Sequence, residues 1–346
     1  MWTRTLLRTS AVILTVVVAV STGGLILSPV ACAQEAGAAP GPEATASVWT
    51  QAQWLRLDIN GGRIVLTSRR CGQTRLNIEP TEASPLRQSL AVDAQPGALV
   101  ASFEATSADQ TITLSVDARQ QLTIARRASG GNANDLKYVQ PPLGPVMLAI
   151  GADQPRKYSA ASLWHLLMAE PVAREELLPV LTTIHPDWPL EQQLAAAESA
   201  LISVVPADNR VQRDEWQAWV EQLADPSFAR RNEADLALRA AGQAVVVHLR
   251  RLDPATLDRE QRQRIAGILR AVSGSGADSP ERVAEWLCDC QRVWLAQLSR
   301  PDSKARLAAA GHLSQLSGKP IAIDPAASNE RQAQQVVELK ALLSEH

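Results

Sequence analysis

The histidines and serines are the first residues to test for catalysis or metal binding, and their spacing supports neither. The sequence contains five histidines, and no two of them lie at a spacing typical of metal ligands. His248 and His312 fall inside apolar helical patterns, where a single imidazole is typical of packing. Ser162, Ser203 and Ser279 lack the turn that exposes a nucleophilic hydroxyl. We therefore predict no catalytic, metal-binding or cofactor-binding residues, and no cofactor.

Cys288-Asp289-Cys290 contains the one closely spaced pair of thiols. On a continuous helix, side chains two residues apart point about 200° away from each other, so these sulfurs cannot share a metal ion. An exported chain favours a disulfide instead. We expect Cys71 to pair with Cys288 or Cys290, which would hold the β domain against the helices and leave one free thiol.

Tryptophan is abundant, with nine residues in the chain. Four of them fall at helical spacings, which is typical of a packed core. The alternative is an aromatic groove that binds a peptide or a glycan. These candidate interaction residues are Trp216, Trp219, Trp286 and Trp294.

Basic and acidic residues are nearly balanced, with a formal net charge of -2. The arginine pairs have acids among them, which is typical of a solvated surface. A chain of this kind has no electrostatic footprint for nucleic acid, and we predict no nucleic-acid partner.

The N-terminus has the three parts of an export signal, and we assign residues 1–33 to a signal peptide. Arg4 and Arg8 give the positive start, Ala11 to Leu27 is apolar, and Ala31-Cys32-Ala33 places small residues before cleavage at Gln34. The predicted location is therefore periplasmic or secreted, with no membrane span after cleavage.

Two alternatives to cleavage remain open for this segment. An uncleaved anchor is one, because Ala11 to Val30 is nearly long enough to span a membrane and would tether the protein. Acylation at Cys32 is the other, although Pro29 stands where a lipoprotein signal has leucine.

A flexible Ala/Pro/Gly linker is predicted over 34–47, followed by a β domain over 48–150. Trp54 to Thr67 alternates as a hairpin does, with its turn at Asn60-Gly61. Five further runs alternate in the same way, and seven strands predict an antiparallel β-sandwich or barrel. The further runs are Arg75 to Ile78, Gln88 to Val92, Leu99 to Phe103, Thr111 to Val116 and Gln121 to Ala125.

The rest of the chain is predicted to be helical, with a connecting region over 151–206 and an all-α domain over 207–346. Ser159 is expected to cap a helix that runs to Ala169. Ser279-Pro280-Glu281 is a helix start, and we expect one long helix from there to about Ser299. In the segment after Pro226, the candidate packing residues are Phe228, Ala234, Leu236, Ala237 and Leu238.

The helical part repeats itself. Trp219-Val-Glu-Gln-Leu223, with Pro226 and Arg230, is echoed by Trp294-Leu-Ala-Gln-Leu298, with Pro301 and Arg306, at an offset of 75 residues for the Trp element. Two helix-pair units have about this length in HEAT-type solenoids. Residues 213–318 thus resemble the HEAT-like repeats of bacterial exported repeat proteins. The resemblance implies binding through one concave helical face. Together with the β domain, the predicted class is an α+β multidomain chain, and an irregular α-helical bundle is the alternative for the helical part.

We expect from these features an exported, non-catalytic protein-interaction or scaffold protein of the periplasm or cell envelope, with an unknown protein partner. One alternative is an envelope hydrolase, for which Asp135 and Asp153 near the domain joint are the candidate acids. Another is a ligand- or glycan-binding β module on a helical support. It would need an exposed aromatic stripe, for which the β domain offers Trp49, Trp54 and Phe103.

Overall fold

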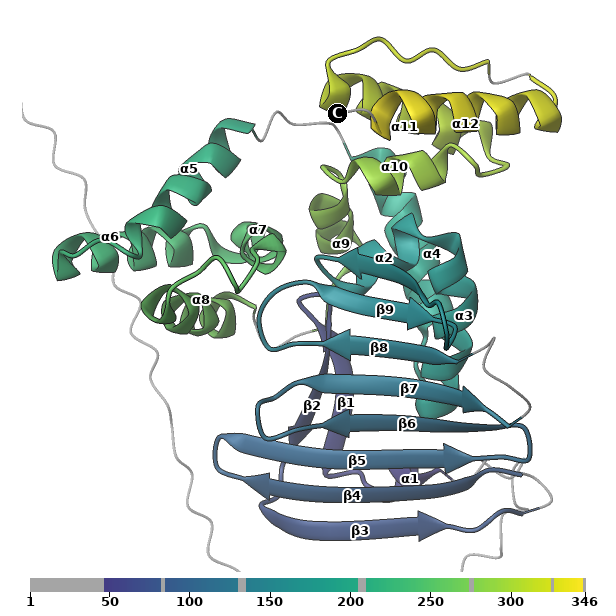
Figure 1. Cartoon of the computed structure of the whole chain (residues 1–346), viewed down its shortest axis with the longest axis vertical. Coiled ribbons are helices and arrows are strands. Elements are labelled where there is room, and N and C mark those ends of the chain that lie inside the picture. Colours follow the sequence, from purple (N-terminus) through teal and green to yellow (C-terminus); the bar gives the residue numbers. More distant parts are fainter. Residues whose placement is uncertain are drawn as a thin grey trace, which may run out of the picture. The chain divides into compact units, whose positions relative to one another are not determined.

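The computed structural model describes residues 47–81, 85–129, 135–204, 210–273, 277–324 and 327–344. All of them lie in one compact unit of the chain, Glu43–His346. The predicted signal peptide and all but the last residue of the predicted linker lie outside the described residues. A β-rich segment is followed by helices, which confirms the α+β class (Figure 1).

The larger sheet is an eight-stranded antiparallel meander in which each strand pairs with its neighbours in sequence. Its edges are β3 and β10, so the sheet is open. The predicted sandwich or barrel is corrected here, because a hairpin and helices, rather than a second large sheet, cover the buried face. The strands are β3 (Gly72–Ile78), β4 (Arg87–Gln95), β5 (Ala98–Thr106), β6 (Gln110–Val116), β7 (Leu122–Ala128), β8 (Leu136–Gln140), β9 (Val146–Ile150) and β10 (Arg156–Ala160).

Alternation of apolar and polar residues sets the register of this sheet. Leu99, Ala101, Phe103 and Ala105 of β5 are buried, and the residues between them face outward. Phe103 pairs with Leu114 on β6, so buried residues oppose buried residues across the strands. A shift of the register by one residue would move this whole apolar row to the solvent-facing side of the sheet.

The smaller sheet is the hairpin of β1 (Leu55–Asn60) and β2 (Arg63–Ser68). The hairpin prediction is confirmed, but its turn is Gly61-Gly62 rather than Asn60-Gly61. Both glycines have positive φ, +56° and +68°, which a two-residue turn of this kind requires.

Asp278 holds this turn against the helices. Its carboxylate accepts hydrogen bonds from the backbone N–H groups of Gly61 and Gly62 and from the indole of Trp164, each at 2.7 Å. A Cβ atom added at Gly62 would lie 2.5 Å from Cβ of Ser162. The hairpin therefore docks only where both turn residues lack side chains.

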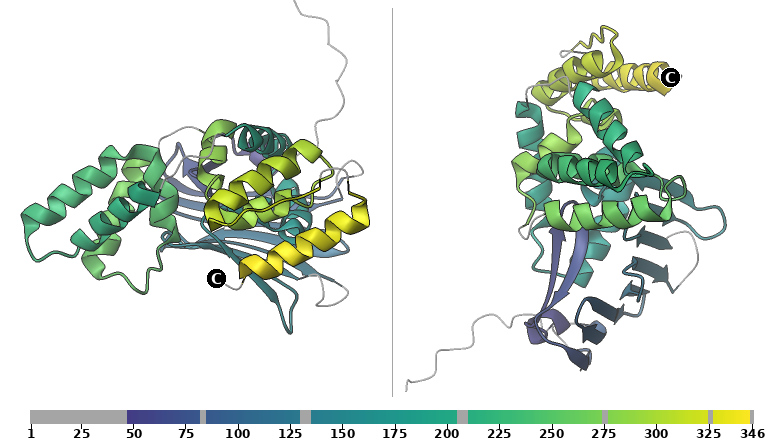
Figure 2. Two further views of the ribbon diagram at one scale, coloured as in Figure 1. Left: turned by 90° about the horizontal axis from the view of Figure 1, so that it is seen from above. Right: turned by 90° about the vertical axis from the view of Figure 1, so that its left-hand side faces the viewer.

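The helices form two groups around two buried clusters (Figures 1 and 2). The first cluster includes the sheet, α1 to α4 and α9 to α11; the second is built mainly from α5 to α8. The described helices are α1 (Val48–Gln51), α2 (Leu163–Ala169), α3 (Pro171–Ile184), α4 (Leu190–Ser203), α5 (Arg210–Gln222), α6 (Phe228–Ala240), α7 (Val246–Arg251), α8 (Arg259–Val272), α9 (Pro280–Leu287), α10 (Gln291–Gln297), α11 (Ser303–Ser317) and α12 (Asn329–Ser344).

Two helix boundaries differ from the predictions. Ser159 lies in β10, and the N-cap of α2 is Ser162, whose hydroxyl accepts a hydrogen bond from the backbone of His165. The long helix predicted after Ser279 is interrupted at residues 288–290, which separate α9 from α10. The helical spacing argument for Cys288 and Cys290 therefore does not apply.

The sequence echo corresponds to a repeated loop. Arg231 Nη1 donates to the carbonyl oxygens of Asp225 and Pro226 at 2.8 and 3.0 Å. At an offset of 75 residues, Arg306 Nη1 donates to those of Arg300 and Pro301 at 2.9 and 2.7 Å. Arg231, and not Arg230, is thus the structural counterpart of Arg306.

Candidate functional site

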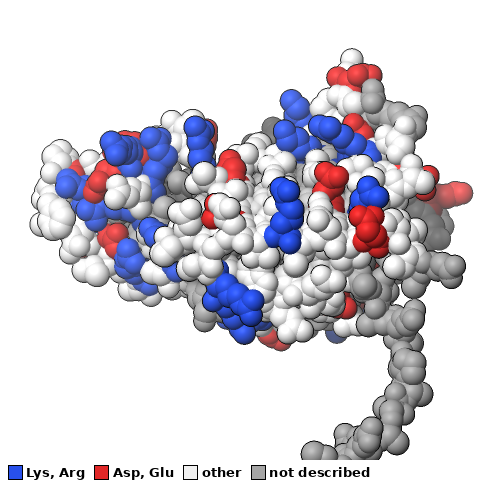
Figure 3. Space-filling model, turned by 90° about the horizontal axis from the view of Figure 1, so that it is seen from below, with Lys and Arg blue, Asp and Glu red and all other residues white. Residues whose placement is uncertain are grey.

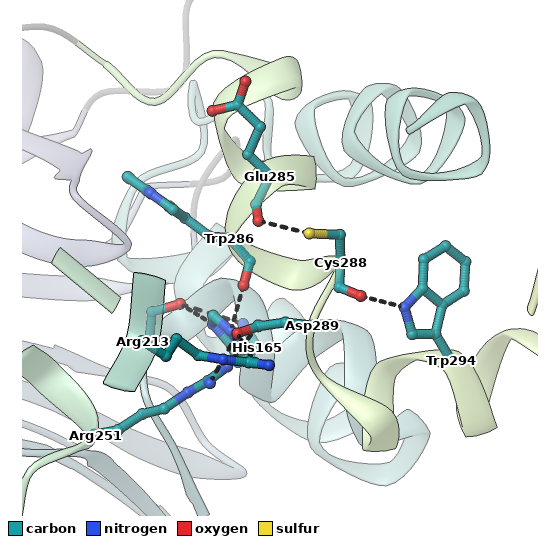
Figure 4. A network of polar contacts seen from close by, with 9 residues as sticks. His165, Arg213, Arg251, Glu285, Trp286, Cys288, Asp289 and Trp294 are labelled. Atoms are coloured by element: carbon teal, nitrogen blue, oxygen red, sulfur yellow. Dashed lines mark hydrogen bonds and ion pairs between the residues drawn. The ribbon is translucent and has the colours of Figure 1, made fainter. Parts of the chain in front are cut away.

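Asp289, in the turn between α9 and α10, is the centre of a polar network (Figure 4). Its carboxylate accepts a hydrogen bond from Arg213 Nη1 of α5 at 2.9 Å. Arg251, at the end of α7, donates to it through Nη1 at 3.2 Å and Nη2 at 3.0 Å. Two guanidinium groups from the α5–α8 group therefore share one carboxylate.

Burial and charge act in opposite directions on this network. Burial alone would raise the pKa of Asp289, but Arg251 and Arg213 outweigh it and hold the pKa below its ordinary value. Burial likewise disfavours the charged form of Arg251, but Asp289 raises its pKa overall. The network is therefore ionised at neutral pH and carries one more positive than negative charge.

A pocket of about 360 Å³ lies on one side of the network. We name it the Trp216 pocket and define it by Arg213, Trp216, His248, Arg251, Trp286 and Asp289. The rings of Trp216 and His248 lie side by side with their centroids 5.8 Å apart and their planes tilted by 57°. Aromatic and charged groups thus line the same cavity.

A second pocket, of about 320 Å³, also includes Arg251 and Asp289 and is bordered by His165. His165 Nε2 donates to the carbonyl of Trp286 at 3.0 Å, so Nδ1 accepts from the hydroxyl of Ser162 at 2.8 Å. Ser162 is 1% exposed and donates to an imidazole whose other nitrogen meets a carbonyl. This Ser–His pair is structural, because no substrate reaches the hydroxyl.

Cys71, Cys288 and Cys290 are free thiols, so the predicted disulfide is not formed in this structure. Cys71 is exposed just before β3, while Cys288 and Cys290 flank Asp289 and pack against the first cluster. Burial raises the pKa of Cys288 to about 11 and also raises that of Cys290. Both thiols are therefore protonated at neutral pH, which makes them poor nucleophiles.

The four candidate tryptophans do not come together as one groove. Trp286 and Trp294 are buried, and Trp294 is stacked on His312 with ring centroids 3.9 Å apart. Trp216 and Trp219 are half-buried against the second cluster. Two of the four, Trp216 and Trp286, line the Trp216 pocket.

The β-domain candidates do not assemble a site. Trp49 and Phe103 are buried with their rings 5.5 Å apart, and Trp54 is half-buried against the first cluster, so the three do not form the exposed aromatic stripe expected for glycan binding. Asp135 accepts a hydrogen bond from the backbone of Ala128 at 3.2 Å, and Asp153 is exposed in the turn before β10. Within the described ranges, no hydrogen bond or ion pair joins these two acids.

An exposed apolar ridge on α6 was not anticipated from the sequence. Phe228 is 66% and Leu236 60% exposed, whereas Ala234 and Leu238 are buried as predicted. Leu236 lies about 200° around the helix from Ala234, so it cannot share the packing face. Arg231 and Arg264 lie over the Phe228 ring, each 5.8 Å from its centroid.

Basic and acidic side chains are interspersed on the face shown in Figure 3. Ion pairs between neighbouring residues occur in the helices, as between Arg264 and Glu260 at 2.7 Å. No cluster of metal-ligating side chains occurs in the described part of the chain. Among the described helices, none is long and apolar enough to cross a membrane. Comparison with protein-family models, curated proteins and solved structures finds no match for this chain.

Proposed function

We propose that this chain is an exported, non-catalytic interaction or scaffold protein of the periplasm or cell envelope that binds a protein partner through its helical surface. The observation that carries the proposal is the ridge of Phe228 and Leu236 on α6. The two side chains lie eight residues, or about 12 Å, apart along α6, and large apolar side chains exposed on one helix favour protein contact over solvent. Export rests on the N-terminal sequence pattern described above.

The arginines beside the ridge support this proposal. Arg231 and Arg264 lie over Phe228, and an aromatic ring flanked by guanidinium groups is typical of an interface core. Both arginines also lie near Glu260, so their positions are held before a partner arrives. Such ordering reduces the entropy lost on binding.

The HEAT-like character of the helical part belongs to the same proposal. Its support is the repeated loop: the buried residues Leu223, Ala234 and Leu238 recur 75 positions later as Leu298, Ala309 and Leu313. Helix-pair repeats expose one helix of each pair along a continuous surface. The α6 ridge is the apolar part of that surface.

Site-specific crosslinking tests the proposal directly. A photoreactive residue at position 228 of the full chain should crosslink one defined partner in envelope preparations. The double substitution Phe228→Asp and Leu236→Asp should weaken binding of that partner at least about tenfold, because interface cores lose more than 1.4 kcal/mol on such changes.

Leu307→Asp is the matched control, because Leu307 is equally apolar and exposed but lies on α11. This variant should bind the partner as the unmodified chain does. Equal loss in both variants, or no crosslinked partner at position 228, would remove the α6 ridge as the binding surface.

A further inference from the structure

The Trp216 pocket has a polar wall with spare donors. Arg213 uses Nη1 for Asp289, and its side chain is 28% exposed at the pocket. Asp289 is already shared with Arg251. Glu285 also borders the pocket, but Figure 4 shows its carboxylate pointing away from the guanidinium groups. The wall near Arg213 is therefore positively charged.

His248 adds an unsatisfied polar atom to the same cavity. Its Nε2 is buried and has no hydrogen-bond partner in the structure. A buried polar atom without a partner costs free energy, and in a folded protein such an atom often marks the place of a bound group. The His248 side chain borders the pocket, so a ligand there lies beside the ring that carries this nitrogen.

The remaining walls are suited to a flat apolar group. The Trp216 ring lies against the His248 ring at an angle of 57°, and Trp286 and Val247 also border the cavity. Trp286 is fixed, because its indole donates to the carbonyl of Gln243 at 3.3 Å. A volume of about 360 Å³ admits a small molecule or the end of a peptide.

We propose that the Trp216 pocket binds a carboxylate attached to a flat apolar group, with the carboxylate on Arg213 and His248 Nε2 and the apolar group beside Trp216. Guanidinium and carboxylate match in shape and charge, and imidazole N–H completes the set of donors. The carboxylate belongs either to a free organic acid or to the C-terminus of a peptide.

The charges around His248 agree with this assignment. Burial, Arg251 and Arg213 lower the pKa of His248, and Asp289 opposes them. The other titratable groups on the walls are Glu285 and Cys288. His248 is thus neutral at pH 7 and presents a single N–H, and a bound carboxylate raises its pKa.

Calorimetric titration of the full chain with phenylacetate tests the proposal, and phenylacetamide is the uncharged comparison. We expect phenylacetate to bind at least about tenfold more tightly than the amide, because only the acid gains the ionic hydrogen bonds. An acetylated dipeptide ending in phenylalanine, as acid and as amide, distinguishes the source. Binding of the peptide acid assigns a C-terminus, and binding of phenylacetate alone assigns a free acid.

His248→Phe provides a variant that keeps its fold. It removes the unsatisfied nitrogen, so the melting temperature should be retained while phenylacetate binding falls about tenfold. His312→Phe is the matched control: His312 Nε2 bonds the carbonyl of Val204 at 3.2 Å, so this variant should lose stability and keep binding. Equal binding of acid and amide, or no binding of either acid at millimolar concentration, would overturn the proposal.

Discussion

The buried imidazole of His165 shows how one residue couples the fold to pH. It is almost completely buried and bonded at both ring nitrogens. Burial lowers its pKa to about 4, and the nearby Arg251 adds to this effect. The folded protein therefore keeps His165 neutral at a pH where the unfolded chain takes up a proton.

The stability of the protein should consequently fall between pH 6.5 and pH 4. Because the pKa of His165 is lowered on folding, the unfolded state binds more protons in this window. The free energy of unfolding therefore decreases as pH falls from 6.5 to about 4. The expected loss is about 3 kcal/mol. Urea unfolding at several pH values measures it.

His165→Gln separates this effect from the other histidines. Glutamine can still donate to the Trp286 carbonyl but does not titrate. The free energy of unfolding of the variant should change less with pH over the same window. Identical slopes for the variant and the unmodified chain would show that His165 does not govern acid sensitivity.

Residue types in the sequence reveal little of the Asp289 network. Asp289 meets Arg251 across 38 positions and Arg213 across 76 positions. No periodic pattern in a sequence predicts contacts between residues so far apart along the chain, because these contacts depend on how α5 and α7 pack beside α9. The interruption between α9 and α10 also lacks the proline or glycine that usually announces one.

At the scale of elements, the repeated loops before α6 and α11 are the clearest regularity. In each, an arginine five residues after a proline binds that proline's carbonyl and the preceding one. These carbonyls lie just before the N-caps Ser227 and Asp302, outside the helices, so the arginine supplies a donor that the helix backbone does not. The arginine thus fixes the angle at which each helix begins.

Substitution should distinguish the two neighbouring arginines in the first loop. Arg231→Met removes two charged hydrogen bonds while keeping most of the apolar stem, and we expect a loss of about 2 kcal/mol in unfolding free energy. Arg306→Met should cost at least as much, because Arg306 is buried. Denaturant unfolding measures both.

Arg230→Met is the control within the same helix turn. Arg230 is exposed and makes only a 3.5 Å contact with Asp225, so its loss should stay below about 0.5 kcal/mol. A cost for Arg230→Met equal to that for Arg231→Met would contradict the loop assignment.

Strands were easier to predict than helix faces for a physical reason. The sheet buries one face, so strict alternation in β4 to β7 survives in the sequence. In α6, by contrast, Ala and Leu occur on both the buried and the exposed side. The exposed Leu236 therefore looked the same as the buried Leu238. Strand β10 was not predicted, because Arg156, Lys157 and Ser159 leave only Tyr158 and Ala160 as apolar residues in it.

At the scale of the whole molecule, two buried clusters meet at the Asp289 network. The second cluster has its own apolar residues, including Leu223, Leu238 and Ile265. Its links to the first group include the ion pairs of Asp289 and the bond from Trp286 to Gln243. Such an arrangement lets one group open while the other stays folded.

Asp289→Asn should expose this division. Loss of the carboxylate charge leaves Arg213 and Arg251 facing each other, and we expect about 2 kcal/mol less protection in α5–α8 than in the sheet. Amide hydrogen exchange resolved by peptide measures the difference. Glu221→Gln, on the exposed side of α5, should change neither region. Uniform loss of protection over the whole chain would show that the two clusters unfold together.

The bonds from Asp278 to the hairpin turn have a consequence for the order in which the chain can fold. They join residues 216 and 217 positions apart. Ribosomes release the N-terminus first, so Gly61 and Gly62 emerge long before the carboxylate that binds them. Until then these two amides have only water as an acceptor, and the hairpin is held by its earlier contacts, such as the two hydrogen bonds between Ile64 and the side chain of Gln140. A fragment cut before Asp278 therefore keeps the bonds between the hairpin and Gln140 but lacks the carboxylate that holds the turn.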